Sequence, residues 1–114
     1  MNYSSDEVKA FAAASLAEIG METKKAEKVC LHLINKFKNI TIKDYGFDPQ
    51  KGVPTTDPKA DPFYSNSRSC THAIYALRIL KSKNAVPVLK EISEKNRDWW
   101  YVCTGADAEH ALEG

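Results

Sequence analysis

The segment Ser69–Lys95 constrains the fold of this chain most strongly, because it has the pattern of two short helices joined by a polar turn. Apolar residues recur three and four positions apart in two runs, as on one side of an α-helix. These runs are Ala73, Ala76, Leu77 and Leu80, and then Ala85, Val88, Leu89 and Ile92. Residues 81–84 separate them, and Pro87 falls in the first turn of the second helix, where its missing N–H costs little. The segment therefore predicts an αα-hairpin, a unit that needs neighbours to bury its apolar residues.

This hairpin resembles a HEAT repeat, in the short form of phycobilisome-lyase-like proteins. The resemblance is carried by Ala73, Ala76, Leu77, Leu80 and the run Asn84-Ala85-Val86-Pro87-Val88-Leu89, in which Ala-Val-Pro-x-Leu is the most specific part. Residues 97–114 look like the first helix of a following repeat. Lys81 stands where the family often has glycine. The resemblance implies an all-α fold, a short HEAT-like αα-hairpin solenoid of about two and a half repeats with a long inter-repeat loop.

The 114 residues favour one domain with one modest core. We expect a helical hairpin over residues 4–38, a loop over 39–67, a second helical hairpin over 69–95 and a terminal helix over 98–113. In the first helix, Ser4 and Glu7 have the spacing of a capping box, and Gly20 is placed to end the helix in a left-handed conformation. One apolar stripe of that helix is expected in the core: Val8, Phe11, Ala12, Leu16 and Ile19.

The segment 39–67 breaks the helical pattern, since it holds four of the five prolines. Its aromatic residues alternate with aspartates, and a recognition loop needs this mixture of rigid apolar anchors and polar groups. The alternative is that the aromatics fix the loop to the helices and the aspartates form turns. Beyond it, one of the adjacent Trp99 and Trp100 is expected in the core and the other partly exposed. The predicted partner-binding residues are Asp44, Tyr45, Phe47, Asp48, Asp61, Phe63, Tyr64, Trp99 and Trp100.

Charge and cysteine content limit the partners of the chain. A net charge of +1 gives no general attraction to nucleic acid or anionic membranes. Five lysines cover one side of the second predicted helix, but Glu27 interrupts them, so we favour an ordinary solvated surface over a nucleic acid contact, and we expect no membrane partner. No apolar run approaches the roughly 20 residues of a membrane span, and no secretory leader opens the chain. Three cysteines, an odd number, favour free thiols and a cytoplasmic location.

Motifs for catalysis or metal binding are weak. Cys30-Leu31-His32 and Cys70-Thr71-His72 repeat a Cys-x-His spacing, but residues two apart on a helix point about 200° apart and cannot meet at one metal. No phosphate-binding glycine loop or nucleophile motif occurs. We therefore expect no catalytic residue, no cofactor and no metal site, although a Cys–His or Asp–His pair assembled in three dimensions stays open.

These features predict a non-catalytic protein-binding module. HEAT-like proteins mostly act as scaffolds or adaptors, and a small site-free chain also fits an immunity protein that inhibits a toxin domain by direct binding. Two alternatives remain. One is a nucleic-acid-binding HEAT-like protein that uses the basic side of the second helix. The other is a small lyase-like or cofactor-handling protein, which rests on the phycobilisome-lyase-like resemblance alone.

Overall fold

The computed structural model describes residues 5–54 and 56–114. These ranges contain five α-helices and two short 3-10 turns and no β-strand, apart from one antiparallel bridge between Thr41 and Tyr101. The all-α class predicted from the sequence is confirmed. The elements are α1 (Ser5–Ile19), α2 (Thr23–Phe37), η1 (Ile42–Tyr45), η2 (Pro58–Ala60), α3 (Asp61–Ile79), α4 (Val86–Lys95) and α5 (Gly105–Glu113).

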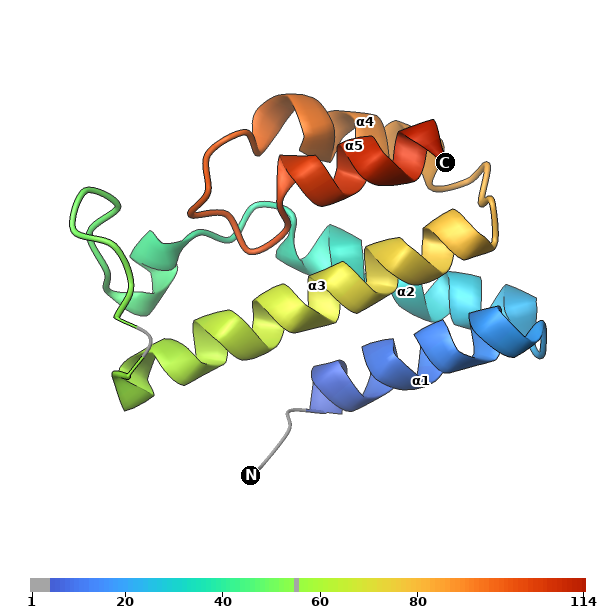
Figure 1. Ribbon diagram of the computed structural model, residues 1–114, viewed down its shortest axis with the longest axis horizontal. Helices are drawn as coiled ribbons and strands as arrows, with labels where there is room; N and C mark the ends of the chain where they lie inside the picture. The colour runs from blue at the N-terminus through green and yellow to red at the C-terminus, as the bar shows by residue number, and fades with distance from the viewer. Residues whose placement is uncertain (1–4, 55) are drawn as a thin grey trace.

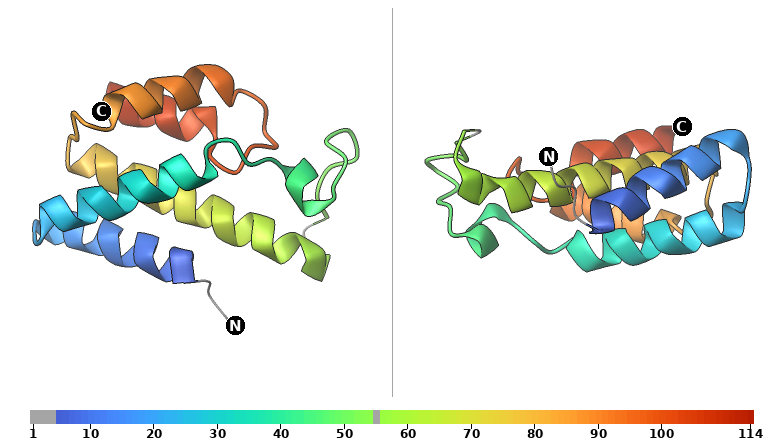
Figure 2. Two further views of the ribbon diagram at one scale, coloured as in Figure 1. Left: turned by 180° about the vertical axis from the view of Figure 1, so that it is seen from behind. Right: turned by 90° about the horizontal axis from the view of Figure 1, so that it is seen from below.

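The five helices form two layers (Figure 1). Helices α1, α3 and α5 lie side by side in one layer, and α2 and α4 form the other, as the view from below in Figure 2 shows. The long helix α3 occupies the centre, because it contacts α1, α2 and α5, while α4 packs mainly on α5. None of the helices in the described ranges combines the length and the apolar character that a bilayer crossing requires.

The core is formed by the apolar sides of α2, α3 and α4. Leu77, in the last turn of α3, is 1% exposed, and Leu89 and Ile92 of α4 are 3% and 1% exposed. Buried residues of α2 complete this part of the core: Ala26, Cys30, Leu33, Ile34 and Phe37. Most apolar residues of the predicted αα-hairpin are therefore buried, but α4 packs on α5 more than on α3.

The prediction for α1 was wrong, because the helix turns its large apolar residues outward. Val8, Phe11 and Ile19 are 57%, 61% and 65% exposed. The buried side instead holds Ala10, Ala13, Ala14, Ala17 and the carboxylate residue Glu7. Small side chains let α1 approach α2 and α3 closely, and this close packing outweighs the burial of bulkier groups. The expected capping partner Ser4 lies outside the described residues.

Two predicted boundaries were also wrong. Helix α3 begins at Asp61, so the predicted loop over 39–67 ends early; Asp57 accepts a hydrogen bond from the Lys59 N–H and Pro58 opens η2, which leads directly into α3. The terminal helix begins at Gly105 instead of residue 98, because the Thr104 hydroxyl accepts the N–H of Asp107 and caps it there.

The segment before α5 is extended and pairs with the residues that follow α2. The N–H of Ile42 donates to the Trp100 carbonyl (3.1 Å), and the N–H of Val102 donates to the Ile40 carbonyl (3.0 Å). Asn96 is 1% exposed at the end of α4, and its side-chain amide donates to the carbonyls of Lys38 and Cys103, both at 2.8 Å. One buried amide therefore joins the chain after α2 to the chain before α5.

The turns after α1 and α3 contain residues in the left-handed conformation. Gly20 has φ of 74°, as predicted for a helix-ending glycine. Lys81 has φ of 51°, and a lysine there is strained because its Cβ crowds the backbone. Asn84 does not cap α4; its side chain donates to Glu27 instead (3.1 Å).

A disulfide joins Cys70 in α3 to Cys103, which corrects the expectation of three free thiols. The linked cysteines are 33 positions apart. Closing a loop of that length restricts the unfolded chain, and the lost entropy raises the free energy of unfolding by about 4 kcal/mol at 25 °C. Cys30 is free and buried, and burial raises the pKa of its thiol to about 12. The bond fixes the connection into α5 against the central helix.

Thiol alkylation at pH 8 should report this arrangement. We expect no rapid labelling of the folded protein, because Cys30 is buried and protonated and the other two cysteines are bonded. In denaturant without reductant, mass spectrometry should show one added group, and after reduction three. Three added groups before reduction would contradict the disulfide.

Candidate partner-binding surfaces

The predicted aromatic residues of the loop and of α3 gather in one cluster. Tyr45 and Phe63 meet edge to face with ring centroids 5.8 Å apart, and Phe63 and Tyr64 do so at 5.3 Å. The Tyr64 hydroxyl donates to the Val53 carbonyl (3.0 Å), and the Asn66 amide donates to the Tyr45 hydroxyl (2.6 Å). Phe63 is buried, while Tyr45, Tyr64 and Phe47 are half-buried against the core. These contacts fix the loop to α3, and a part in partner binding stays a prediction.

The predicted aspartates lie on the surface. The Asp44 carboxylate accepts the N–H of Thr41 at 2.9 Å and completes a capping box at η1. The Asp48 carboxylate accepts the N–H of Gln50 at 2.9 Å. Asp61 is exposed in the first turn of α3. Asp44 and Asp48 therefore make the turn hydrogen bonds that were the alternative explanation for them.

The two tryptophans differ in exposure, as the sequence predicted. Trp99 is 55% exposed, and Trp100 is partly buried against the core. Their rings meet edge to face at 5.9 Å. A Cβ on Gly52 would lie 3.9 Å from the Trp99 ring, so the loop and the tryptophan pair are neighbours. Trp99 is thus the large exposed aromatic among the nine predicted residues.

Two substitutions distinguish a residue of this cluster that stabilises the fold from one that only lies on the surface. Tyr64→Phe removes the hydrogen bond to Val53 and should lower the free energy of unfolding by about 1 kcal/mol. Trp99→Ala should change it by less than about 0.5 kcal/mol, as for most surface substitutions. Urea denaturation measures both. A larger loss for Trp99→Ala than for Tyr64→Phe would show that Trp99 serves the fold.

A second surface was not predicted and lies on α1. We name it the α1 stripe: Val8, Phe11 and Ile19, with Tyr75 of the adjacent α3. The Phe11 ring meets the edge of the His72 ring at 5.5 Å, and Tyr75 is 43% exposed. A hydrogen bond with Glu18 raises the pKa of the Tyr75 phenol and holds its ring beside α1. The α1 stripe is therefore an exposed apolar surface that spans two helices.

A buried carboxylate sets the rotation of α1. Glu7 is 5% exposed, and its side chain accepts hydrogen bonds from Arg68 Nε (2.6 Å), Arg68 Nη2 (3.3 Å) and Ser65 Oγ (2.8 Å). The hydrogen bond from Arg68 lowers the pKa of Glu7, with support from Ser65 and the charges of Arg68 and His72, although burial opposes the shift. Because Glu7 and the alanines face α3, the opposite side of α1 must face solvent.

The lowered pKa of Glu7 predicts a pH dependence. The folded state binds the proton less tightly than the unfolded chain, so this stabilisation is present above the ordinary carboxyl pKa of 4.5 and is lost as the pH falls below it. Glu7→Gln should lower the free energy of unfolding at pH 7 by about 1–3 kcal/mol, because Arg68 and Ser65 lose a charged acceptor.

Denaturation curves from pH 7 to pH 3 should then show a smaller loss for Glu7→Gln than for the parent. Equal slopes for the two proteins would contradict the role of Glu7.

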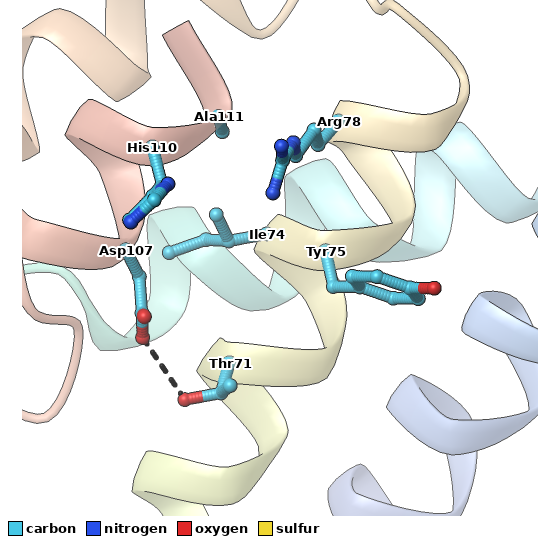
Figure 3. Close-up of a pocket in the computed structure, with 7 residues that line it drawn as sticks. All are labelled: Thr71, Ile74, Tyr75, Arg78, Asp107, His110 and Ala111. Atoms are coloured by element: carbon cyan, nitrogen blue, oxygen red, sulfur yellow. Dashed lines mark hydrogen bonds between the residues drawn. The ribbon is translucent and has the colours of Figure 1, made fainter. Parts of the chain in front are cut away.

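A hollow of about 210 Å³ lies between α3 and α5, next to the α1 stripe. In Figure 3 the Tyr75 ring points away from the hollow toward α1, and Arg78 reaches across toward α5. The Thr71 hydroxyl donates to the Asp107 carboxylate (3.0 Å) and ties the two helices together. The full lining is Thr71, Ile74, Tyr75, Arg78, Asp107, His110 and Ala111. Tyr75 is the border between this hollow and the α1 stripe.

The two Cys-x-His pairs are kept apart by the fold. Cys70 is bonded to Cys103, and Cys30 is buried while His32 is exposed. Within residues 5–54 and 56–114, no group of three or more histidine, cysteine or acidic residues is placed to hold a metal ion.

Sequence reasoning missed the α1 stripe because α1 carries two stripes with the same period. Ala10, Ala13, Ala14 and Ala17 recur as regularly as the larger apolar residues on the other side. Choosing the more hydrophobic stripe as the core gave the wrong side. The available signal was the alanine ladder, which is typical of a helix that approaches its neighbour closely.

Comparison of the chain with known protein families, with curated proteins and with solved structures finds no match.

Proposed function

We propose that this chain is a non-catalytic protein-binding module and that the α1 stripe contacts the partner. One observation carries the proposal: α1 buries alanines and a carboxylate, while Val8, Phe11 and Ile19 face solvent. Contiguous exposed apolar residues commonly mark interaction sites. Tyr75 adds a side chain of the type that contributes strongly to binding energy.

An amphipathic helix of another protein is the partner that fits this surface. Ala12 and Ser15 lie between Val8 and Ile19 along the exposed side of α1, so a second helix can approach closely at the middle. Its own apolar residues, spaced three and four apart, would then contact the larger side chains on either side. Trp99, exposed beside the loop, is the second contact point that we propose.

We further propose a HEAT-like arrangement and an inhibitory role. The arrangement is supported by the alternation of the helices between two layers, with α1, α3 and α5 in one and α2 and α4 in the other. A toxin-neutralising immunity protein needs only a binding surface, and the chain offers one. The carboxylate of Glu7 and the sulfur of Cys70 both serve the fold, since Glu7 forms an ion pair with Arg68 and Cys70 is bonded to Cys103. The disulfide favours an oxidising compartment over the cytoplasm first expected.

The double variant Val8→Ser/Phe11→Ser tests the function. It should unfold within about 0.5 kcal/mol of the parent, because both side chains are exposed, yet bind the partner at least tenfold more weakly. Site-specific photo-crosslinking in the native host supplies the binding measurement. A crosslinker at Phe11 should capture a discrete protein, and a crosslinker at the exposed Lys90 of α4 is the matched control.

Three results would count against this proposal. Equal capture from Phe11 and Lys90 would show that α1 is not selective. Unchanged partner affinity of the double variant would move the site to Trp99, which Trp99→Ala then tests. Light scattering that shows a dimer of the purified parent but a monomer of the double variant would assign the stripe to self-association.

A further inference from the structure

We propose that the outward side of α2 binds the phosphate backbone of duplex DNA without regard to sequence. This basic face consists of Lys24, Lys25, Lys28, His32 and Asn35, all exposed. Lys24, Lys28 and His32 follow one another at four-residue intervals, about 6 Å apart along the helix. The site belongs to the α2–α4 layer and is separate from the α1 stripe (Figure 2).

The acidic residue that interrupts the lysines in the sequence does not interrupt them in space. Glu27 is half-buried and accepts a hydrogen bond from the Asn84 side chain at 3.1 Å, on the edge of α2 nearest the α3–α4 turn. That contact also brings the turn containing Lys81 and Lys83 beside α2. Glu27 therefore lies at the edge of the basic face and is engaged by Asn84.

The lysines of α2 divide into paired and unpaired groups. Lys36 is 2.6 Å from the Asp6 carboxylate, and Lys38, just after the helix, is 3.0 Å from that of Glu91. Among the residues that the structure describes, none forms an ion pair with Lys24, Lys25 or Lys28. Three cations on the basic face are thus available to an external anion.

The near-zero net charge conceals a separation between the layers. Helices α1, α3 and α5 together hold three basic and seven acidic residues, whereas α2 holds four lysines and one glutamate. A polyanion is therefore repelled by one layer and attracted to α2 in the other, which orients its approach.

The side chains on the basic face favour duplex DNA over other polyanions. Helices that bind membranes insert large apolar side chains, but Val29 and Leu31 are half-buried against the core. Proteins that hold single strands stack the bases mainly on phenylalanine, tyrosine and tryptophan rings, and α2 exposes none of these. Phosphate contacts need cations alone, and the major groove of B-DNA admits an α-helix while that of A-form RNA is too narrow.

Fluorescence anisotropy with a labelled 20-base-pair DNA duplex of arbitrary sequence tests the proposal. The parent should bind at 50 mM salt, and log K should fall against log salt with a slope of about −3, as expected when three phosphate contacts release counterions. Lys24→Gln/Lys25→Gln/Lys28→Gln should weaken binding at least tenfold and flatten the slope. Lys9→Gln/Lys51→Gln/Lys59→Gln removes the same charge from exposed lysines elsewhere and should bind within twofold of the parent.

Each other outcome overturns the proposal. Equal loss in the two triple variants would show that net charge alone matters. Tighter binding to a single strand of equal length, to duplex RNA or to vesicles containing phosphatidylserine would assign the basic face to that ligand. The variant Val8→Ser/Phe11→Ser should bind the duplex like the parent, so failure of the protein-binding proposal and failure of this one can be told apart.

Discussion

The close contact between α1 and α3 is the interaction on which the rest of the structure depends. Alanines on α1 allow the two helices to approach, and Glu7 adds a nearly buried carboxylate that Arg68 and Ser65 satisfy. A carboxylate buried without such partners would be strongly unfavourable, so rotating α1 about its axis is prevented by electrostatics as well as by size. The exposure of Val8 and Phe11 is a consequence of this contact, because no other side of α1 can satisfy Glu7.

The opposite edge of α3 is held by a different set of bonds. The disulfide from Cys70 fixes the chain just before α5, and the Thr71 hydroxyl holds Asp107 in the first turn of that helix. The Asn96 side chain then connects this segment to the end of α2. Gly105 packs directly on Asn96, because a Cβ at position 105 would lie only 2.8 Å from the backbone carbonyl oxygen of Asn96. The short helix α5 thus needs little intrinsic helix propensity, because the disulfide and the buried hydrogen bonds hold it in place.

Periodicity predicted the two helices α3 and α4 because each has a single apolar stripe there, with a polar turn between them. Periodicity failed for α1, where alanines form one stripe and larger apolar residues form another. The larger residues are more hydrophobic and were expected in the core, but the alanine stripe is the buried one. Periodicity also failed at residue 98, because Asp98 before Trp99 resembles a helix start while the hydroxyl of Thr104 is the actual cap. The pairing of Cys70 with Cys103 depends on tertiary structure, so a cysteine count could not predict it. The aromatic content of the loop is plain in the sequence, but the sequence could not distinguish rings that anchor the loop to the fold from rings exposed to a partner.

Two helical layers give this small chain two surfaces that can change independently. The outer residues of α1 and the lysines of α2 contribute little to the core, since alanines, Glu7 and the inner stripe of α2 carry the packing. Selection for a partner can therefore act on either side without loss of the fold. The charge separation follows the same division, because acidic residues collect on the layer of α1, α3 and α5 and lysines on α2. A protein bound at the α1 stripe would leave the basic face free, so the two proposed ligands could be held at once and brought together by this chain.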